Sequence, residues 1–134
     1  MEAKLKHLEF IQAAIARMST NSSLFKGWAI TIASALAAFS AFNTKVALLA
    51  IALISTAMFC GLDGYYLWLE RGFVALHNEV ANKSENDINF SMRIDKSNAL
   101  RKWLNACRRH HLVAFYGIII AVELIGIFLI KGVR

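Results

Sequence analysis

Residues 112–130 read LVAFYGIIIAVELIGIFLI, a run of 19 residues whose one ionisable carboxyl group belongs to Glu123. An α-helix needs about 20 consecutive apolar residues to cross the hydrocarbon core of a bilayer. The run therefore predicts a transmembrane helix, and membrane insertion becomes the first expectation for the whole chain.

The composition favours the same class of protein. The 134 residues are 57% hydrophobic and 18% charged, with mean hydropathy +0.48 and no proline. A soluble chain of this length leaves about a third of its surface in water and could not bury so much apolar area. We expect an all-α membrane protein, a single membrane domain over residues 1–134. Because three spans enclose no aqueous path, we also expect an oligomeric bundle.

Two further apolar runs lie upstream, over residues 27–42 and 46–62, and only three residues separate them. So short a connection predicts a tight antiparallel hairpin of two spans. The first run is short for a span, so Lys26 and Lys45 are expected to extend toward the two membrane surfaces. Alanines at four-residue steps predict close helix packing in this span. They are Ala29, Ala33, Ala37 and Ala41.

The second apolar run ends where polar and aromatic residues begin. Asp63 marks the expected change from hydrocarbon to water, and an aromatic belt follows, so the span is expected to cover residues 46–68. The apolar spacing then continues, which predicts that the helix extends as a stalk to about residue 81 and packs against its copies in neighbouring subunits. The spacing is carried by Leu69, Phe73, Leu76 and Val80.

Two amphipathic segments flank this hairpin. Residues 3–20 predict an amphipathic helix on the membrane surface or against partner helices, and the polar run 19–23 is expected to cap a new helix. Residues 82–111 are expected to form a cytoplasmic loop and a basic helix. Asp95 or Ser97 would cap that helix, which is expected to run from about residue 98 to 111 and directly into the third span, 112–130.

The lysines and arginines are distributed unevenly. With the amino terminus in the cytoplasm, four precede the first span and eight more lie between residues 71 and 109 on the same side, against three outside. Positive charge collects on the cytoplasmic side of membrane proteins. This predicts a multi-pass protein with a cytoplasmic amino terminus and a short external tail, Lys131 to Arg134.

The basic helix predicts an anion-binding face. Polar residues share one of its sectors and are followed by His110; they are Arg101, Lys102, Asn105, Arg108 and Arg109. In a symmetric oligomer they would converge on a cytoplasmic opening that holds a nucleotide or oligonucleotide. Attraction to anionic lipid headgroups is the other open interpretation. Trp103 shares the opposite, apolar face and is expected to pack there.

Glu123 lies near the middle of the third span, where an ionised side chain is costly unless it faces water or a partner. One interpretation is a pore-lining or gating carboxylate repeated around an oligomer axis. The other is a hydrogen bond inside the bundle, for example with Tyr116. Thr56 and Asp63 lie on a smaller, more polar face of the second span, which could line a narrow water path or serve close packing.

Signs of catalysis are missing from the sequence. Cys60 and Cys107 fall in different segments without a second ligand pair, and the four histidines show no metal spacing. The chain contains no glycine-rich phosphate loop, nucleophile elbow or acid–base carboxylate pair. We expect neither an enzyme nor a bound cofactor.

Six short motifs resemble a large family of small bacterial inner-membrane proteins. They are LEFIQ (8–12), IARM (15–18), NS (21–22), KGW (26–28), LDGYYLWLER (62–71) and NFSM (89–92). The chain looks most like the pore-forming membrane effector of the Hailong antiphage defence system. The resemblance implies a homo-oligomeric channel, favouring a tetramer, in the inner membrane. Single-stranded DNA oligomers, made by a nucleotidyltransferase encoded nearby, would hold this channel shut, and their loss would depolarise an infected cell.

Three other functions remain open. A small proton-coupled transporter would use the intramembrane carboxylate, although such proteins usually have four spans. A holin-like toxin is similar in size but has no obvious use for the stalk. A membrane adaptor would recruit a soluble partner and contain no pore.

Overall fold

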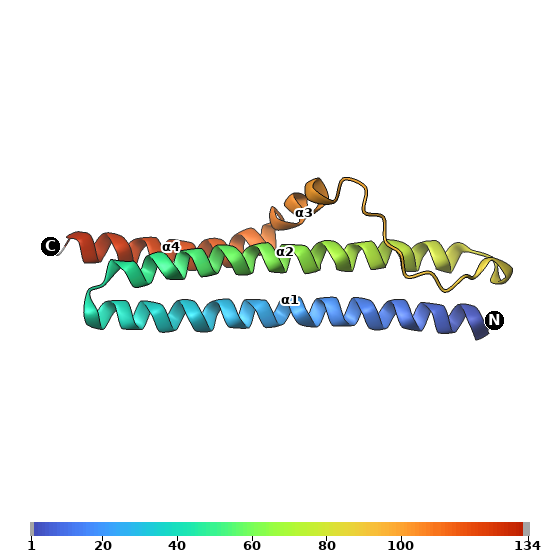
Figure 1. Ribbon diagram of the computed structural model, residues 1–134, viewed down its shortest axis with the longest axis horizontal. Helices are drawn as coiled ribbons and strands as arrows, with labels where there is room; N and C mark the ends of the chain where they lie inside the picture. The colour runs from blue at the N-terminus through green and yellow to red at the C-terminus, as the bar shows by residue number, and fades with distance from the viewer. Residues whose placement is uncertain (1, 133–134) are drawn as a thin grey trace.

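The computed structural model describes residues 2–132, the side chain of Asn43 excepted, and these residues form four α-helices and no strand. The helices are α1 (Glu2–Asn43), α2 (Val46–Asn82), α3 (Ala99–Cys107) and α4 (His110–Gly132), with a short 3-10 helix at Glu85–Asp87. α1 and α2 form a long antiparallel hairpin, α4 lies beside α2 near the hairpin turn, and α3 packs against α2 at an angle to the other helices (Figure 1). The predicted turn at residues 43–45 is confirmed.

Three helices, α1, α2 and α4, are long and apolar enough to cross a membrane. The 42 residues of α1 extend about 63 Å at 1.5 Å per residue, roughly twice the thickness of the hydrocarbon core. The molecule therefore has two parts. We call residues 22–42, 46–68 and 112–130 the membrane half, and residues 2–21 and 69–82 the distal half.

α1 is one uninterrupted helix, so the prediction of a separate amphipathic helix that ends before a capped first span is wrong. The polar run 19–23 lies inside the helix, where the Ser22 hydroxyl binds a side chain of α2 instead of capping a backbone. Apolar packing supports the helix on the amino-terminal side of this run, because Ile11 is buried against Leu76 and Val80 of α2. Tertiary contacts outweigh the local capping preference of serine and asparagine.

The predicted helical continuation of the second span is present, since α2 extends to Asn82. Within this chain it packs against α1. Lys4 of α1 binds the end of this segment: its amine donates to the carbonyl oxygens of Ala81 at 2.7 Å and Lys83 at 2.9 Å. The irregular segment that follows returns along the hairpin, where His7 donates to the Ser91 carbonyl at 3.2 Å.

The basic helix is shorter than predicted and does not run directly into the third span. α3 ends at Cys107, and a turn at Arg108 and Arg109 precedes α4. The expected cap is also wrong, because Asn98, in a left-handed conformation (φ 52°), is the N-cap residue and forms no side-chain cap. Asp95 instead accepts hydrogen bonds from the Ser97 backbone at 2.7 Å and the Lys102 amine at 2.6 Å.

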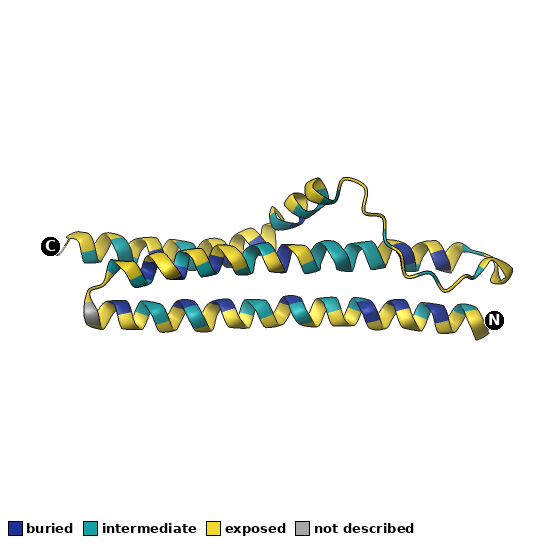
Figure 2. Cartoon of the chain, in the orientation of Figure 1, coloured by how far each residue is buried: buried dark blue, intermediate teal, exposed yellow. Residues whose placement is uncertain are grey.

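Burial is confined to the sides where the helices face one another, and their outward sides are exposed (Figure 2). Ala29 and Ala33 are buried as the alanine spacing predicts, whereas Ala37 is half-buried and Ala41 is exposed. Large apolar side chains such as Phe128, 77% exposed, cover the outside of the membrane half. Such a surface is stable in contact with lipid or with other subunits.

Candidate functional site

Asp63 joins all three helices of the membrane half. Its Oδ1 accepts a hydrogen bond from the Ser22 hydroxyl of α1, and its Oδ2 forms an ion pair with the Lys26 amine at 2.6 Å. The Tyr116 hydroxyl of α4 donates to the same Oδ2 atom at 3.2 Å. We call Ser22, Lys26, Asp63 and Tyr116 the Asp63 network.

The network exists because its α1 members are four residues apart and so share one face of the helix. The Lys26 amine donates to Ser22 at 2.8 Å, and both side chains reach the same carboxylate. The Asp63 side chain is fully buried, while 27% of the Lys26 side chain is exposed. Removing one partner of a buried ion pair typically costs about 3–5 kcal/mol, because the remaining charge is left uncompensated.

α3 packs against α2 beside this network. The Trp103 indole donates to the Gly61 carbonyl at 2.9 Å, as expected for a side chain that packs on the protein. Gly64 lies so close to Cys107 that a Cβ atom there would overlap the sulfur. The absence of a side chain at residue 64 therefore lets α3 pack against α2, and burial raises the pKa of the Cys107 thiol.

A second polar contact lies deeper in the membrane half. The Thr56 hydroxyl of α2 donates to Oε1 of Glu123 in α4 at 2.9 Å. The bundle hydrogen bond expected for Glu123 is therefore present, but with Thr56 and not with Tyr116, whose hydroxyl faces Asp63. Oε2 of Glu123 is buried and has no hydrogen-bond partner among the described residues.

The four residues expected to line a pore or form a gate are enclosed between the helices of one chain. Thr56, Asp63, Tyr116 and Glu123 are each at most 2% exposed. None of the four lies on the outer surface, although Glu123 also lines a hollow between α1 and α4. The expectation that Asp63 meets water is also wrong, because Ser22, Lys26 and Tyr116 take the place of water around it.

The predicted anion-binding face is largely exposed. Arg101, Asn105, Arg108, Arg109 and His110 are all exposed, and the three arginines make no ion pair with any described residue. Lys102 differs, because it is half-buried and pairs with Asp95. That pairing holds the pKa of the exposed Asp95 carboxyl well below its usual range.

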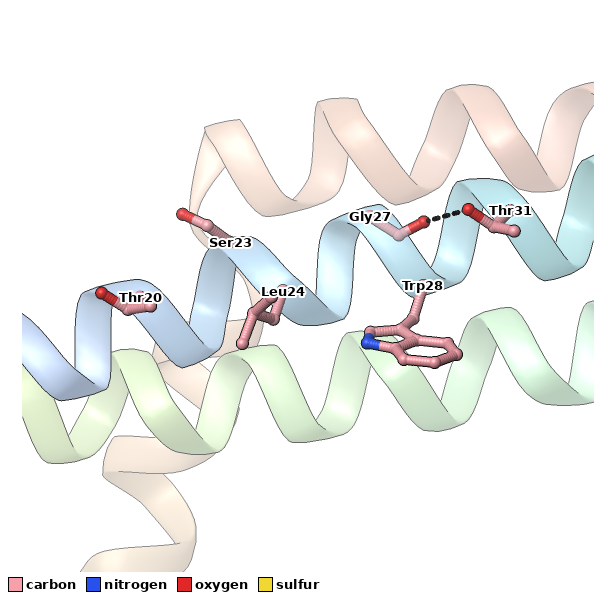
Figure 3. A pocket seen from close by; sticks show the side chains of 6 residues that line it. All are labelled: Thr20, Ser23, Leu24, Gly27, Trp28 and Thr31. Carbon is pink, nitrogen blue, oxygen red and sulfur yellow. Dashed lines mark hydrogen bonds between the residues drawn. The ribbon is translucent and has the colours of Figure 1, made fainter.

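The outward face of α1 carries small and hydroxylated residues that the sequence patterns did not single out. A shallow hollow on this face is shown in Figure 3, where the Thr31 hydroxyl donates to the Gly27 carbonyl at 2.9 Å. The hollow is lined by Thr20, Ser23, Leu24, Gly27, Trp28 and Thr31. A count of hydroxyl and glycine positions along one helix face would have identified it.

Two members of the Asp63 network were also missed. Ser22 was assigned to a cap and Lys26 to the membrane surface, although both bind a carboxylate 41 and 37 residues away in the chain. A lysine just before one apolar run and an aspartate just after the next were the available signal, because a tight hairpin brings these two positions to the same depth.

No group of histidine, cysteine, aspartate or glutamate within the described residues could hold a metal ion. Comparisons of the chain with protein-family models, with curated proteins and with solved structures found no match. The structure itself shows three helices that suit a multi-pass membrane protein, with one polar network joining them.

Proposed function

We propose that the chain is the subunit of an oligomeric ion channel that an anionic cytoplasmic ligand controls. The ligand is a short single-stranded DNA oligomer or another nucleotide, and its binding keeps the channel closed. The resemblance to the pore-forming Hailong effector favours a tetramer in the bacterial inner membrane, with a cytoplasmic amino terminus and a nucleotidyltransferase encoded nearby. The proposed role is antiphage defence.

The proposal rests on one observation. The exposed arginines of the α3–α4 turn directly precede α4, and α4 is bound to α1 and α2 through the Asp63 network. Arg108 and Arg109 are exposed and unpaired within the described chain, so they are available to phosphate groups. Tyr116, on α4, donates to Asp63. A ligand that moves the start of α4 therefore acts on the contact between α4 and the α1–α2 pair.

The conducting path requires several subunits, because three helices enclose no aqueous path. Narrow pores are lined by polar or small side chains. On α1 the outward face supplies Ser23, Gly27 and Thr31, all exposed. We assign this face to the pore in place of the buried Thr56, Asp63, Tyr116 and Glu123.

A ligand can shift a channel only by binding its closed and open states with different affinity. In the closed state, bound phosphates would neutralise Arg108 and Arg109 and hold the α3–α4 turn as seen here. After loss of the ligand, repulsion between the exposed arginines of neighbouring subunits favours displacement of α4. Binding that depends on phosphate contacts weakens as salt concentration rises.

Conductance of the purified protein in planar bilayers, with and without short single-stranded DNA, tests the proposal. We expect current without the oligomer and suppression when it is added on the arginine side. Arg108→Ala with Arg109→Ala should abolish suppression while leaving the current intact. Lys6→Ala with Arg17→Ala, which removes two exposed cations from the distal half, is the matched control and should change neither.

Absence of current in both conditions would reject the channel. Current that DNA suppresses equally in the double-arginine variant would reject the α3–α4 turn as the ligand site.

A further inference from the structure

We propose that the groove between α1 and α4 is a binding site for a lipophilic amine that enters from the membrane and is held by Glu123. The site lies in the membrane half, away from the arginines of the α3–α4 turn. It does not depend on the proposed channel function.

The groove consists of two adjoining hollows between α1 and α4, the second of which is also bordered by Leu49 of α2. The first, of about 270 Å³, is lined on α1 by Ala33, Ser34 and Ala37 and on α4 by Ile119, Val122 and Glu123. The other, of about 580 Å³, shares Ala37 and Val122 and continues toward the hairpin turn past Ala41 and Gly126. Small residues on α1 leave the space open, and the walls are mostly apolar. Pockets of this size suit small organic molecules.

The Glu123 carboxyl is the polar feature that points to a ligand. It lines the first hollow, is 2% exposed, and has one oxygen bound by Thr56. The other oxygen, Oε2, lacks a hydrogen-bond partner in the described chain. A buried acceptor without a donor is unfavourable, so binding of a ligand that supplies the missing donor is favoured.

A second group in the same hollow narrows the chemistry of the ligand. Ser34 is exposed, lines the hollow, and makes no hydrogen bond that engages its hydroxyl within the described residues. An amine carries more than one N–H donor and can serve both Oε2 of Glu123 and the Ser34 oxygen. A hydrocarbon body attached to that amine would fill the apolar hollow that extends toward Gly126.

Neither a lipid tail nor a second copy of the chain supplies a hydrogen-bond donor for Oε2 of Glu123. An acyl chain fills apolar space but has no donor for Glu123. In a copy rotated about the membrane normal, the hydroxyls near this depth belong to the exposed Thr31 and Ser34 and to the half-buried Ser55. Thr31 already donates to the Gly27 carbonyl at 2.9 Å. Ser55 already donates to the Ile51 carbonyl at 3.0 Å, and Ser34 belongs to the groove wall itself.

Labelling of the full chain in lipid nanodiscs with dicyclohexylcarbodiimide tests the site. The reagent dissolves in membranes and takes the proton of a carboxylic acid on its nitrogen while the carboxyl oxygen adds to its central carbon. The whole reagent is therefore retained. We expect peptide mass spectrometry to find the label on Glu123, and Glu123→Gln to remove it.

Protection by 1-adamantylamine then measures binding. At about ten times its dissociation constant, the amine should slow labelling of Glu123 about tenfold, by mass action. Adamantane, which has the same cage without the nitrogen, should protect much less. Ala37→Phe, which fills the groove, should abolish protection, whereas Ala57→Phe on the exposed face of α2 should retain it. Circular dichroism confirms that each variant is folded.

Three outcomes would overturn the proposal: an unlabelled Glu123, equal protection by amine and hydrocarbon, or protection that survives Ala37→Phe. A Glu123 that is labelled in detergent monomers but shielded in the oligomer would assign the groove to a second copy instead. Because the readout is a chemical label, failure of the proposed channel leaves this test unaffected.

Discussion

In the distal half of the hairpin, α1 and α2 meet mainly through apolar side chains, with Ile11 packed against Leu76 and Val80. In the membrane half a buried ion pair of Lys26 with Asp63 joins the two helices, beside apolar contacts such as that of Phe25 with Phe59. Water drives the first kind of contact, because apolar surface is removed from it. A bilayer supplies no such force between helices, and small residues and polar contacts take its place. One continuous helix pair thus uses two different interactions in two different solvents.

The largest effect is expected from removal of the polar contact between the helices of the membrane half. Asp63→Ala leaves the Lys26 charge without its partner and removes the acceptor of Ser22 and Tyr116, so we expect a loss of about 3–5 kcal/mol in unfolding free energy. Denaturation in mixed micelles, followed by circular dichroism, measures it. Glu79→Ala, which breaks the exposed pair with Lys83, is the control and should cost less than about 1 kcal/mol.

The double variant Lys26→Met with Asp63→Leu separates the contribution of the ion pair from that of the hydrogen bonds. Replacing both partners of a buried ion pair with apolar residues often restores stability. A double variant as unstable as the single one would show that the hydrogen bonds of Ser22 and Tyr116, and not the ion pair, join the helices.

The next largest effect is expected from removal of an apolar contact in the distal half. Ile11→Ala creates a cavity beside Leu76 and Val80 and should cost about 2–4 kcal/mol. Hydrogen exchange should show that the cost falls on the distal half, with faster exchange in residues 2–18 and 72–82. If exchange accelerates equally in the membrane half, the two halves unfold as one unit and the comparison is wrong.

A smaller effect is expected where α3 joins the membrane half. Gly64→Leu forces Cys107 away from α2 and should cost about 1–3 kcal/mol. The freed thiol should react faster with a membrane-impermeant maleimide, because burial no longer raises its pKa. Gly117→Leu is the matched control, since a Cβ atom at Gly117 meets nothing within 4 Å. Unchanged Cys107 reactivity in Gly64→Leu would contradict this account of α3 packing.

The smallest effect concerns an exposed pair outside both halves. Lys102 lowers the pKa of Asp95 in the folded chain, so the pair contributes stability above the usual aspartate pKa, near 4, and loses it as pH falls below that value. We expect the protection of residues 95–102 against hydrogen exchange, relative to the intrinsic rate at each pH, to fall slightly on acidification. Asp95→Asn should remove this pH dependence, and its persistence in the variant would assign it to another group.

Sequence patterns predicted the helical class, the three spans, the hairpin turn and the stalk, because these depend on the local order of apolar residues. They failed for Ser22, whose local preference is to cap a helix but whose partner lies 41 residues away. They failed in a similar way for Asp63, since an aspartate at the end of an apolar run looks like a membrane boundary. The burial of Tyr116 and Glu123 depends on how α4 rotates about its axis, which its almost uniformly apolar sequence does not specify.

The α1–α2 pair is tied at both ends, by the tight turn at residues 43–45 and by the Lys4 amine that holds the last carbonyls of α2. Sliding or separation of these two helices would have to break one of these contacts, so we expect them to move as one unit. Among the described residues α4 has no comparable second contact, being joined to α3 through a two-residue turn and to the pair through the Tyr116 and Glu123 contacts. Any change of shape within the membrane half is therefore expected to be a rotation of α4 against an unmoving pair.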